Sequence, residues 1–301
     1  MSHYNFETPG PVRLRVDNKS GDVRVRARPG PTTDVEVTGT GSSGQELESG
    51  TRVEHQKGEG GSVHTVVVEV PSPQGFMRSL ATWGASVTLR VNLPEGAEIQ
   101  VSTAAGDIGA EGAYGEARLG TASGDISVDR VSGDLSASTA SGEIKASLVE
   151  GKTELTTASG DVVCDLLHGP ARIRTASGDV AVREAHAHLS TQTASGDVRV
   201  GELRDGCQLQ TASGDQELER AVSGHAQLQT MSGDLVVGVP RGTDVAVDAE
   251  TMTGNLSSEI ELSTEPPGNE PTGLAGAGPG GHRLELKART VTGDLVIKRV
   301  P

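Results

Sequence analysis

Apolar and polar residues alternate along most of the chain, in short runs that glycines interrupt. In the stretch after Gly124, for example, Ile126, Val128, Leu135 and Ala137 alternate with serine and aspartate. A period of two is typical of a β-strand that buries one face and exposes the other. A helical stripe of period 3.6 does not survive a glycine every nine residues or so. The pattern therefore predicts an all-β chain of short strands.

A single turn motif, Thr-Ala-Ser-Gly-Asp with small variations, recurs through the middle of the chain. Its glycines are separated by 18 positions each time: Gly106, Gly124, Gly142, Gly160, Gly178, Gly196 and Gly214. A second turn glycine lies midway, as at Gly115 and Gly133. Strands this short cannot bury an apolar face alone, so each is expected to stack on its equivalent one coil away. The sequence predicts a single-stranded parallel β-solenoid of 18-residue coils, right-handed by the general handedness of parallel crossovers.

The regular array is assigned to residues 94–301. After residue 230 the motif loosens into TMSGDL, TMTGNL and TVTGDL, which indicates longer loops between coils. Residues 264–281 are dense in glycine and proline and are predicted to be a flexible insertion. The similar segments that begin at Leu93 and Val239, each with a Pro-x-Gly step, suggest two related solenoid starts.

The first third of the chain, residues 1–93, is less regular. An early copy of the turn motif surrounds Gly21, and alternating runs lie at residues 35–37 and 63–70. Residues 39–62 are polar and glycine-rich, and we interpret them as a loop. This region is predicted to form irregular coils or a small β cap.

Residues 73–84 predict a short helix within that first third. Phe76, Met77, Leu80 and Trp83 follow the spacing of one helical face. Because an open solenoid end exposes strand edges, we interpret this helix as a cap. The alternative is that it docks on a partner protein or on a membrane surface.

Composition and charge narrow the function classes. The net charge of −15 argues against a nucleic-acid-binding surface, which needs clustered lysine and arginine. Five aromatic residues and 41 glycines fit an interior that is narrow and rich in turns. Cys164 and Cys207 fall more than two coils apart, beyond the reach of a disulfide. Neither a signal peptide nor a membrane-spanning run is visible, which predicts a cytoplasmic protein.

The Pro-x-Gly approach, the repeated S-G-D-[IV] turns and the last strand TGDLVIK together resemble the bacterial family of "putative adhesin" domains of unknown function. The resemblance covers nearly the whole chain and implies a β-solenoid fold. It also implies adhesion, and so leaves the cell surface open as a location.

The repeat aligns carboxylates in one column on the predicted solenoid: Asp107, Asp125, Glu143, Asp161, Asp179, Asp197 and Asp215. Such a column could hold Ca²⁺ through oxygen ligands. We interpret it instead as a structural turn ladder, in which each carboxylate accepts hydrogen bonds from backbone N–H groups of its own turn. His168, His186 and His188 could in the same way bind a transition metal, but no further ligand completes a site and we interpret them as solvated turn residues.

No catalytic residues, metal site or cofactor are predicted, because the repeated serines have no partnering histidine and no phosphate or zinc motif occurs. The leading hypothesis is a non-catalytic β-solenoid that serves as an interaction or adhesin-like scaffold for an unknown protein or glycan. One alternative is a self-assembling scaffold of the bactofilin type, and another is a β-helix enzyme that acts on glycans.

Overall fold

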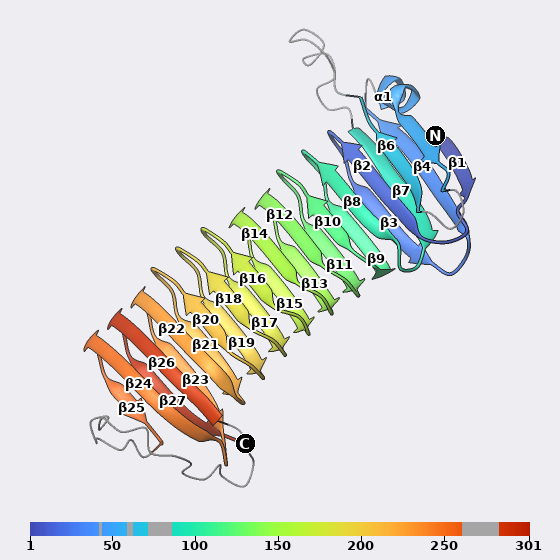
Figure 1. The fold of residues 1–301 in the computed structure, drawn as a ribbon. Coiled ribbons are helices and arrows are strands. Elements are labelled where there is room, and N and C mark those ends of the chain that lie inside the picture. Colours follow the sequence, from blue (N-terminus) through green and yellow to red (C-terminus); the bar gives the residue numbers. More distant parts are fainter. Residues whose placement is uncertain (42–43, 59–62, 72–85, 261–282) are drawn as a thin grey trace. The chain divides into compact units, whose positions relative to one another are not determined.

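The computed structural model describes residues 1–41, 44–58, 63–71, 86–260 and 283–301 (Figure 1). By their contacts they form two compact units, Met1–Gly160 and Asp161–Pro301. Apart from the short helix α1 (Gly44–Gly50), the regular elements of the described residues are all strands, which confirms the all-β prediction. The predicted helix at 73–84, with Phe76, Met77, Leu80 and Trp83, and the predicted insertion at 264–281 lie outside the described residues. The division at residues 93 and 94 stays a prediction.

Two sheets make up the first unit. In order across the first sheet lie β1 (Ser2–Glu7), β4 (Thr32–Thr40), β7 (Ser86–Pro94), β3 (Val23–Arg28), β9 (Ile108–Tyr114), β11 (Ile126–Val131) and β13 (Ile144–Val149). In order across the second lie β5 (Arg52–Gln56), β6 (His64–Glu69), β2 (Val12–Asn18), β8 (Glu98–Thr103), β10 (Ala117–Gly120), β12 (Leu135–Ser141) and β14 (Thr153–Ser159). Antiparallel pairs occur only at one end of this unit's described strands, where β4 joins β1 and β7 and where β5 joins β6.

The second unit also holds two sheets, and its strands pair in parallel throughout the described residues. In order across the first sheet lie β15 (Val162–Leu167), β17 (Val180–Ala185), β19 (Val198–Leu203), β21 (Gln216–Ala221), β23 (Leu235–Pro240), β27 (Leu295–Val300) and β25 (Leu256–Ser258). In order across the second lie β16 (Ala171–Arg174), β18 (Leu189–Gln192), β20 (Cys207–Gln210), β22 (Gly224–Ser232), β26 (Arg283–Thr292) and β24 (Asp244–Thr253).

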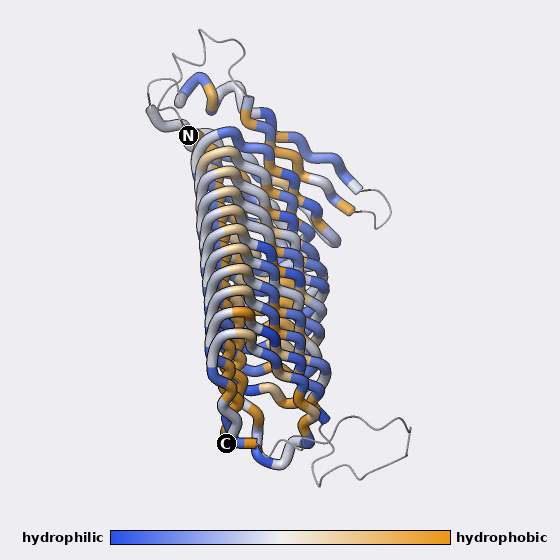
Figure 2. The backbone as a smooth tube through the Cα atoms, turned by 90° about the vertical axis from the view of Figure 1, so that its left-hand side faces the viewer, coloured by the Kyte–Doolittle hydropathy of each residue, from blue (hydrophilic) through white to orange (hydrophobic). Residues whose placement is uncertain are grey.

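Strand register places like residues side by side. Ile126 lies opposite Ile144 in the first unit, and Val180 lies opposite Val198 in the second. Along β11 the apolar residues are buried and the polar residues between them are exposed, so each strand turns one face inward. The same alternation of polar and apolar positions is visible along the strands in Figure 2. Two long parallel sheets with this inward apolar face are consistent with a β-solenoid.

The Pro-x-Gly steps are connections that pass over a neighbouring coil. Between β7 and β8 the chain turns at Gly96 and skips one coil position. That position is occupied by β2, which pairs with β8, and by β3, which lies between β7 and β9. Between β23 and β24 the chain turns at Gly242, and the position it skips is filled by β26 and β27 from later in the sequence. The segment at Val239 is therefore not a second solenoid start, but the approach to an outermost coil.

The interpretation of residues 39–62 as a loop is wrong, because they contain α1 and β5. Glu48 of α1 is buried, and its carboxylate accepts hydrogen bonds from Ser2 Oγ (2.9 Å) and from the backbone N–H of Gly39 (3.1 Å). It also pairs with the N-terminal ammonium of Met1, and these donors, the ammonium first, lower the pKa of Glu48 to about 2. Glu48 thus links α1 to β1 and β4, a long-range contact that the polar composition of residues 39–62 does not reveal.

Candidate functional site

The turn motif works as a set of hydrogen bonds between successive coils. Gly124 has a φ of +151°, and a Cβ atom there would lie 2.1 Å from the carbonyl oxygen of Gly106 in the preceding coil. Only glycine fits such a position. The hydroxyl of Thr139 in the next coil donates to the carbonyl oxygen of Gly124 at 3.2 Å. The threonine and glycine of the motif are therefore explained by packing between coils.

The acidic column also joins coil to coil. Asp125 Oδ1 accepts the backbone N–H of Glu143 at 2.8 Å, and Asp107 Oδ1 accepts that of Asp125 at 2.9 Å. In the second unit the same bond links Asp161, Asp179, Asp197 and Asp215 in turn, at 2.8 to 2.9 Å. The acceptor role matches the sequence interpretation, but the N–H belongs to the next coil and not to the residue's own turn. Asp22, Asp234 and Asp294, which were not assigned to the column, take part in it as well.

Each aspartate of the column completes a backbone ladder, whereas Glu143 Oε2 accepts a hydrogen bond from Lys145 Nζ at 2.7 Å. Around the turn, the N–H of Gly124 donates to Ser141 and that of Ile126 donates to Glu143, both in the following coil. The N–H of Asp125, between them, points to the preceding coil, where the side chain of Asp107 supplies the acceptor. Within the described part of the chain, no three histidine, cysteine or acidic side chains come together as a metal site. The geometry gives the column a structural use.

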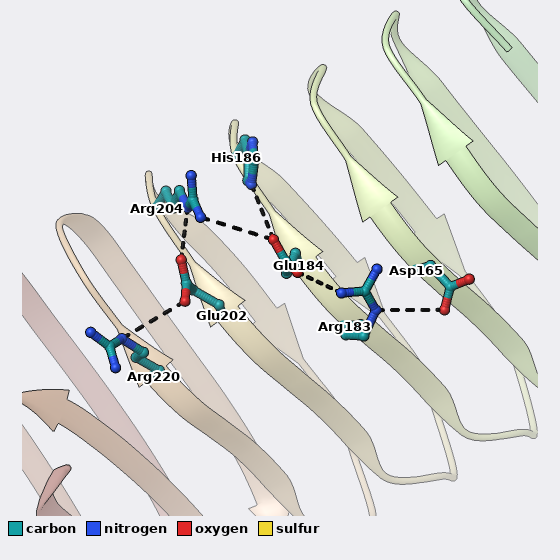
Figure 3. A network of polar contacts seen from close by, with 7 residues as sticks. All are labelled: Asp165, Arg183, Glu184, His186, Glu202, Arg204 and Arg220. Carbon is teal, nitrogen blue, oxygen red and sulfur yellow. Dashed lines mark hydrogen bonds and ion pairs between the residues drawn. The ribbon is translucent and has the colours of Figure 1, made fainter. Parts of the chain in front are cut away.

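A chain of charged side chains lies on the first sheet of the second unit (Figure 3). The ring of His186 stacks on that of His168, with centroids 4.8 Å apart, and its Nε2 lies 3.4 Å from Glu184 Oε2. Glu184 and Glu202 are neighbours in register, and Arg204 lies between them, with Nε 2.7 Å from Glu202 Oε1. Arg183, Asp165 and Arg220 extend the chain at both ends. The arginines and Asp165 are about half exposed, whereas His186, Glu184 and Glu202 are about a quarter exposed. The network separates like charges, and because solvent partly screens its ion pairs, their contribution to stability is modest.

A groove of about 560 Å³ lies on the second sheet of the second unit, where β20, β22, β26 and β24 end. Its floor is a row of threonines, of which Thr211, Thr230 and Thr290 are buried. Side chains alternate between the two faces of a strand, so the residues before and after each inward threonine point outward and form the two walls of the groove. One wall is polar: Gln210, Gln229, Arg289 and Glu250. The other is apolar: Met231, Val291 and Met252.

The apolar wall replaces alanine in the repeat. The position after the motif threonine is an alanine in the seven regular copies, as at Ala194, but it is methionine or valine in the last three. Met231, Val291 and Met252 are 63%, 44% and 82% exposed, so core packing does not explain their size. This departure is visible in the sequence, but the segments TMSGDL, TMTGNL and TVTGDL were interpreted only as a looser spacing of the motif.

The polar wall is a ladder of side-chain contacts. Gln192, Gln210 and Gln229 are joined by amide hydrogen bonds of 3.2 and 3.4 Å, and Arg289 pairs with Glu250 at 3.1 Å. The groove thus combines amide and charged groups on one side with soft apolar side chains on the other. Such a surface can bind an amphipathic ligand, and its lining contains no nucleophile paired with a base.

The chain is similar, at low sequence identity, to several bacterial proteins of known structure. A "putative cell adhesion protein" from Clostridium sporogenes ATCC 15579 is 11% identical, over 99% of each chain, with a TM-score of 0.24. A "putative adhesin" from Bacteroides fragilis NCTC 9343 is 12% identical over 99% of this chain and 96% of its own, with a TM-score of 0.37. Another, from Parabacteroides distasonis ATCC 8503, is 13% identical over 99% and 96%, with a TM-score of 0.28.

No curated protein matches the sequence. No helix of the described residues is long and apolar enough to cross a membrane. The family described as Toastrack DUF4097 matches residues 12–221, more than half of the chain, and confirms the resemblance seen in the repeated S-G-D turns. The chain belongs to the Toastrack DUF4097 family.

Proposed function

We propose that this chain is a non-catalytic, adhesin-like interaction module, a right-handed solenoid of 18-residue coils that binds its partner through the groove of the second unit. The observation that carries the proposal is the apolar wall. Three neighbouring strands place Met231, Val291 and Met252 in solvent at a position where the seven regular copies of the motif, from Thr103 to Thr211, have alanine. Exposed apolar side chains that adjoin each other are typical of interaction surfaces.

The remaining repeated polar groups support a binding role over a catalytic one. The motif glycine and aspartate are engaged between coils, as at Gly124 and Asp125, and so is the threonine in some copies, as at Thr139. A catalytic carboxylate or nucleophile would instead be directed at a bound substrate. Methionine adapts its shape to a partner at low cost, which suits a groove that recognises a ligand by contact area.

A binding survey with matched variants tests the proposal. Wild-type protein is applied to a glycan array and to a panel of purified cytoplasmic and envelope proteins, because both locations are open. The triple variant Met231→Ser, Val291→Ser, Met252→Ser removes the apolar wall. The control variant Ala176→Ser, Ala194→Ser, Ala212→Ser changes the same column in the preceding coils. Surface changes of this kind alter stability by about 0.5 kcal/mol or less each, so both variants are expected to fold.

We expect ligands of the wild-type protein to be retained by the control and lost by the triple variant. Equal binding by all three proteins would remove the groove from the proposal. Release of cleaved products from a bound glycan would contradict the non-catalytic role and favour the enzyme alternative. A wild-type protein whose light scattering shows assembly that grows with concentration would favour the self-assembling scaffold.

A further inference from the structure

The outermost strand of the second sheet in the second unit is β24, which is ten residues long. On one side it pairs with β26 over its whole length. Among the described residues, no strand pairs with its other side. Alternate backbone N–H and C=O groups of such an edge are directed outward, and they form a template for one more strand.

The inward face of β24 is incompletely covered. Its residues Val245 and Val247 are partly exposed, whereas their register partners Leu284 and Leu286 on β26 are fully buried. On every interior strand, a strand on each side covers the inward apolar row. One additional strand with apolar residues at the inward positions would complete this coverage for β24.

The outward face of β24 carries acidic residues at alternating positions. Asp248 and Glu250 are 57% and 68% exposed, and they lie opposite Lys287 and Arg289 of β26. The Lys287 Nζ to Asp248 Oδ2 distance is 3.8 Å, and the Arg289 Nε to Glu250 Oε2 distance is 3.1 Å. The sign of the charge thus changes from β26 to β24, and the next strand would again be favoured if it were basic.

We infer that the open edge of β24 is a docking site for an extended segment of a partner protein, which adds as a strand with basic residues outward and apolar residues inward. Charge complementarity selects this partner, since its bases would pair with Asp248 and Glu250 and the chain as a whole carries −15. A second copy of the chain is a poorer occupant, because two β24 edges would bring the same carboxylates together. β24 also contributes Glu250 and Met252 to the groove, but a docked strand would bind its open backbone edge, and this inference goes beyond the function proposed for the groove.

A peptide with the sequence of β26, Arg-Leu-Glu-Leu-Lys-Ala-Arg-Thr-Val-Thr, has the required pattern and serves as the probe. Its binding to the full-length protein is measured by fluorescence anisotropy. A control peptide carries glutamate in place of the lysine and both arginines. Two further peptides carry N-methyl groups on alternate residues, one in each of the two frames, because only one frame of backbone N–H groups faces the edge strand.

We expect the control peptide to bind about tenfold more weakly, from the loss of two cross-strand charge pairs and the gain of repulsion. One N-methylated peptide is expected to bind like the parent and the other not to bind. The protein variant Asp248→Asn, Glu250→Gln is expected to bind the parent peptide about threefold to tenfold more weakly. The matched variant Glu285→Gln, on the neighbouring strand, should bind it as the wild type does.

Absence of peptide binding overturns the inference, and so does equal binding by both N-methylated frames. A protein that is dimeric in solution, and that the peptide converts to a monomer, would assign the edge to a second copy instead. The groove variant Met231→Ser, Val291→Ser leaves β24 unchanged and should retain the peptide, so failure here is distinguishable from failure of the proposed function.

Discussion

Replacing Gly124 with alanine is expected to destabilise the first unit strongly. The φ of +151° lies in a region that residues with a side chain rarely adopt, at a cost of about 1–3 kcal/mol. In addition, the new Cβ would lie 2.1 Å from Gly106 O and 2.6 Å from its carbonyl carbon, so the two coils must separate. That movement weakens the bonds between these two coils, Gly106 N–H to Ser123 O (3.0 Å) and Thr121 Oγ1 to Gly106 O (3.2 Å). Each is worth about 0.5–1.5 kcal/mol, and the total loss should reach about 3 kcal/mol or more.

The measurement is urea unfolding followed by far-UV circular dichroism, with the m-value fitted separately. Repeat structures can unfold in parts, and a changed m-value would report this. Gly120→Ala is the matched control, because its Cβ would lie 3.5 Å from Ser138 Oγ and its φ is not positive. We expect the control to lie within about 1 kcal/mol of the wild type. If Gly124→Ala were no less stable than Gly120→Ala, the close contact between coils would not be the reason for this glycine.

Three further expectations concern single side chains. Asp125→Ala should lower the free energy of unfolding in urea by about 0.5–1.5 kcal/mol, because the N–H of Glu143 loses its acceptor. Asp125→Asn keeps an acceptor oxygen and should lower it much less. If Ca²⁺ raised the melting temperature of the wild type but not of Asp125→Asn, the column would be a metal site instead. Burial raises the pKa of the Cys164 and Cys207 thiols to about 12, so at about pH 8 the thiolate fraction is on the order of 10⁻⁴. Neither thiol should therefore react with a disulfide reagent until denaturant is added. Fast reaction of either thiol without denaturant would show that the fold opens locally. Burial lowers the pKa of His55, so its neutral ring contributes stability above the ordinary pKa of 6.5, and this stability is lost as the pH falls through the lowered pKa. On acidification, the urea midpoint of His55→Gln should therefore fall less than that of the wild type. Equal falls in the two proteins would contradict this role of His55.

The repeat could be predicted because its determinants are local. Gly124 and Asp125 recur with the same neighbours in every coil, and a strand that packs only on its equivalent needs no other information. The ends could not be predicted in the same way. The pairing of β2 with β8, and of β26 with β22, joins residues far apart in the sequence, and only the general resemblance of the Pro-x-Gly segments hinted at it.

The candidate site was predictable only in part. The repeat shows where the acidic column lies in the sequence, but the N–H group that an aspartate binds depends on how neighbouring coils stack. The groove depends on three exposed side chains, Met231, Val291 and Met252, that become neighbours only because β26 lies between β22 and β24. In sequence order, Met252 precedes Val291, and nothing in the chain indicates that the later residue takes the middle place.

The connections that pass over a coil have a consequence for folding kinetics. Middle coils close short loops, whereas Arg13 of β2 meets Glu98 across 85 residues and Asp294 meets Asp234 across 60. Contacts between residues so far apart in the sequence form more slowly than contacts between neighbouring coils. During synthesis the central coils can form early, whereas the place between β22 and β24 stays empty until β26 has emerged from the ribosome. Closing that gap is then a late event, and a ribosome-bound chain that stops short of residue 283 should expose the interior faces of both neighbouring coils to chaperones and proteases.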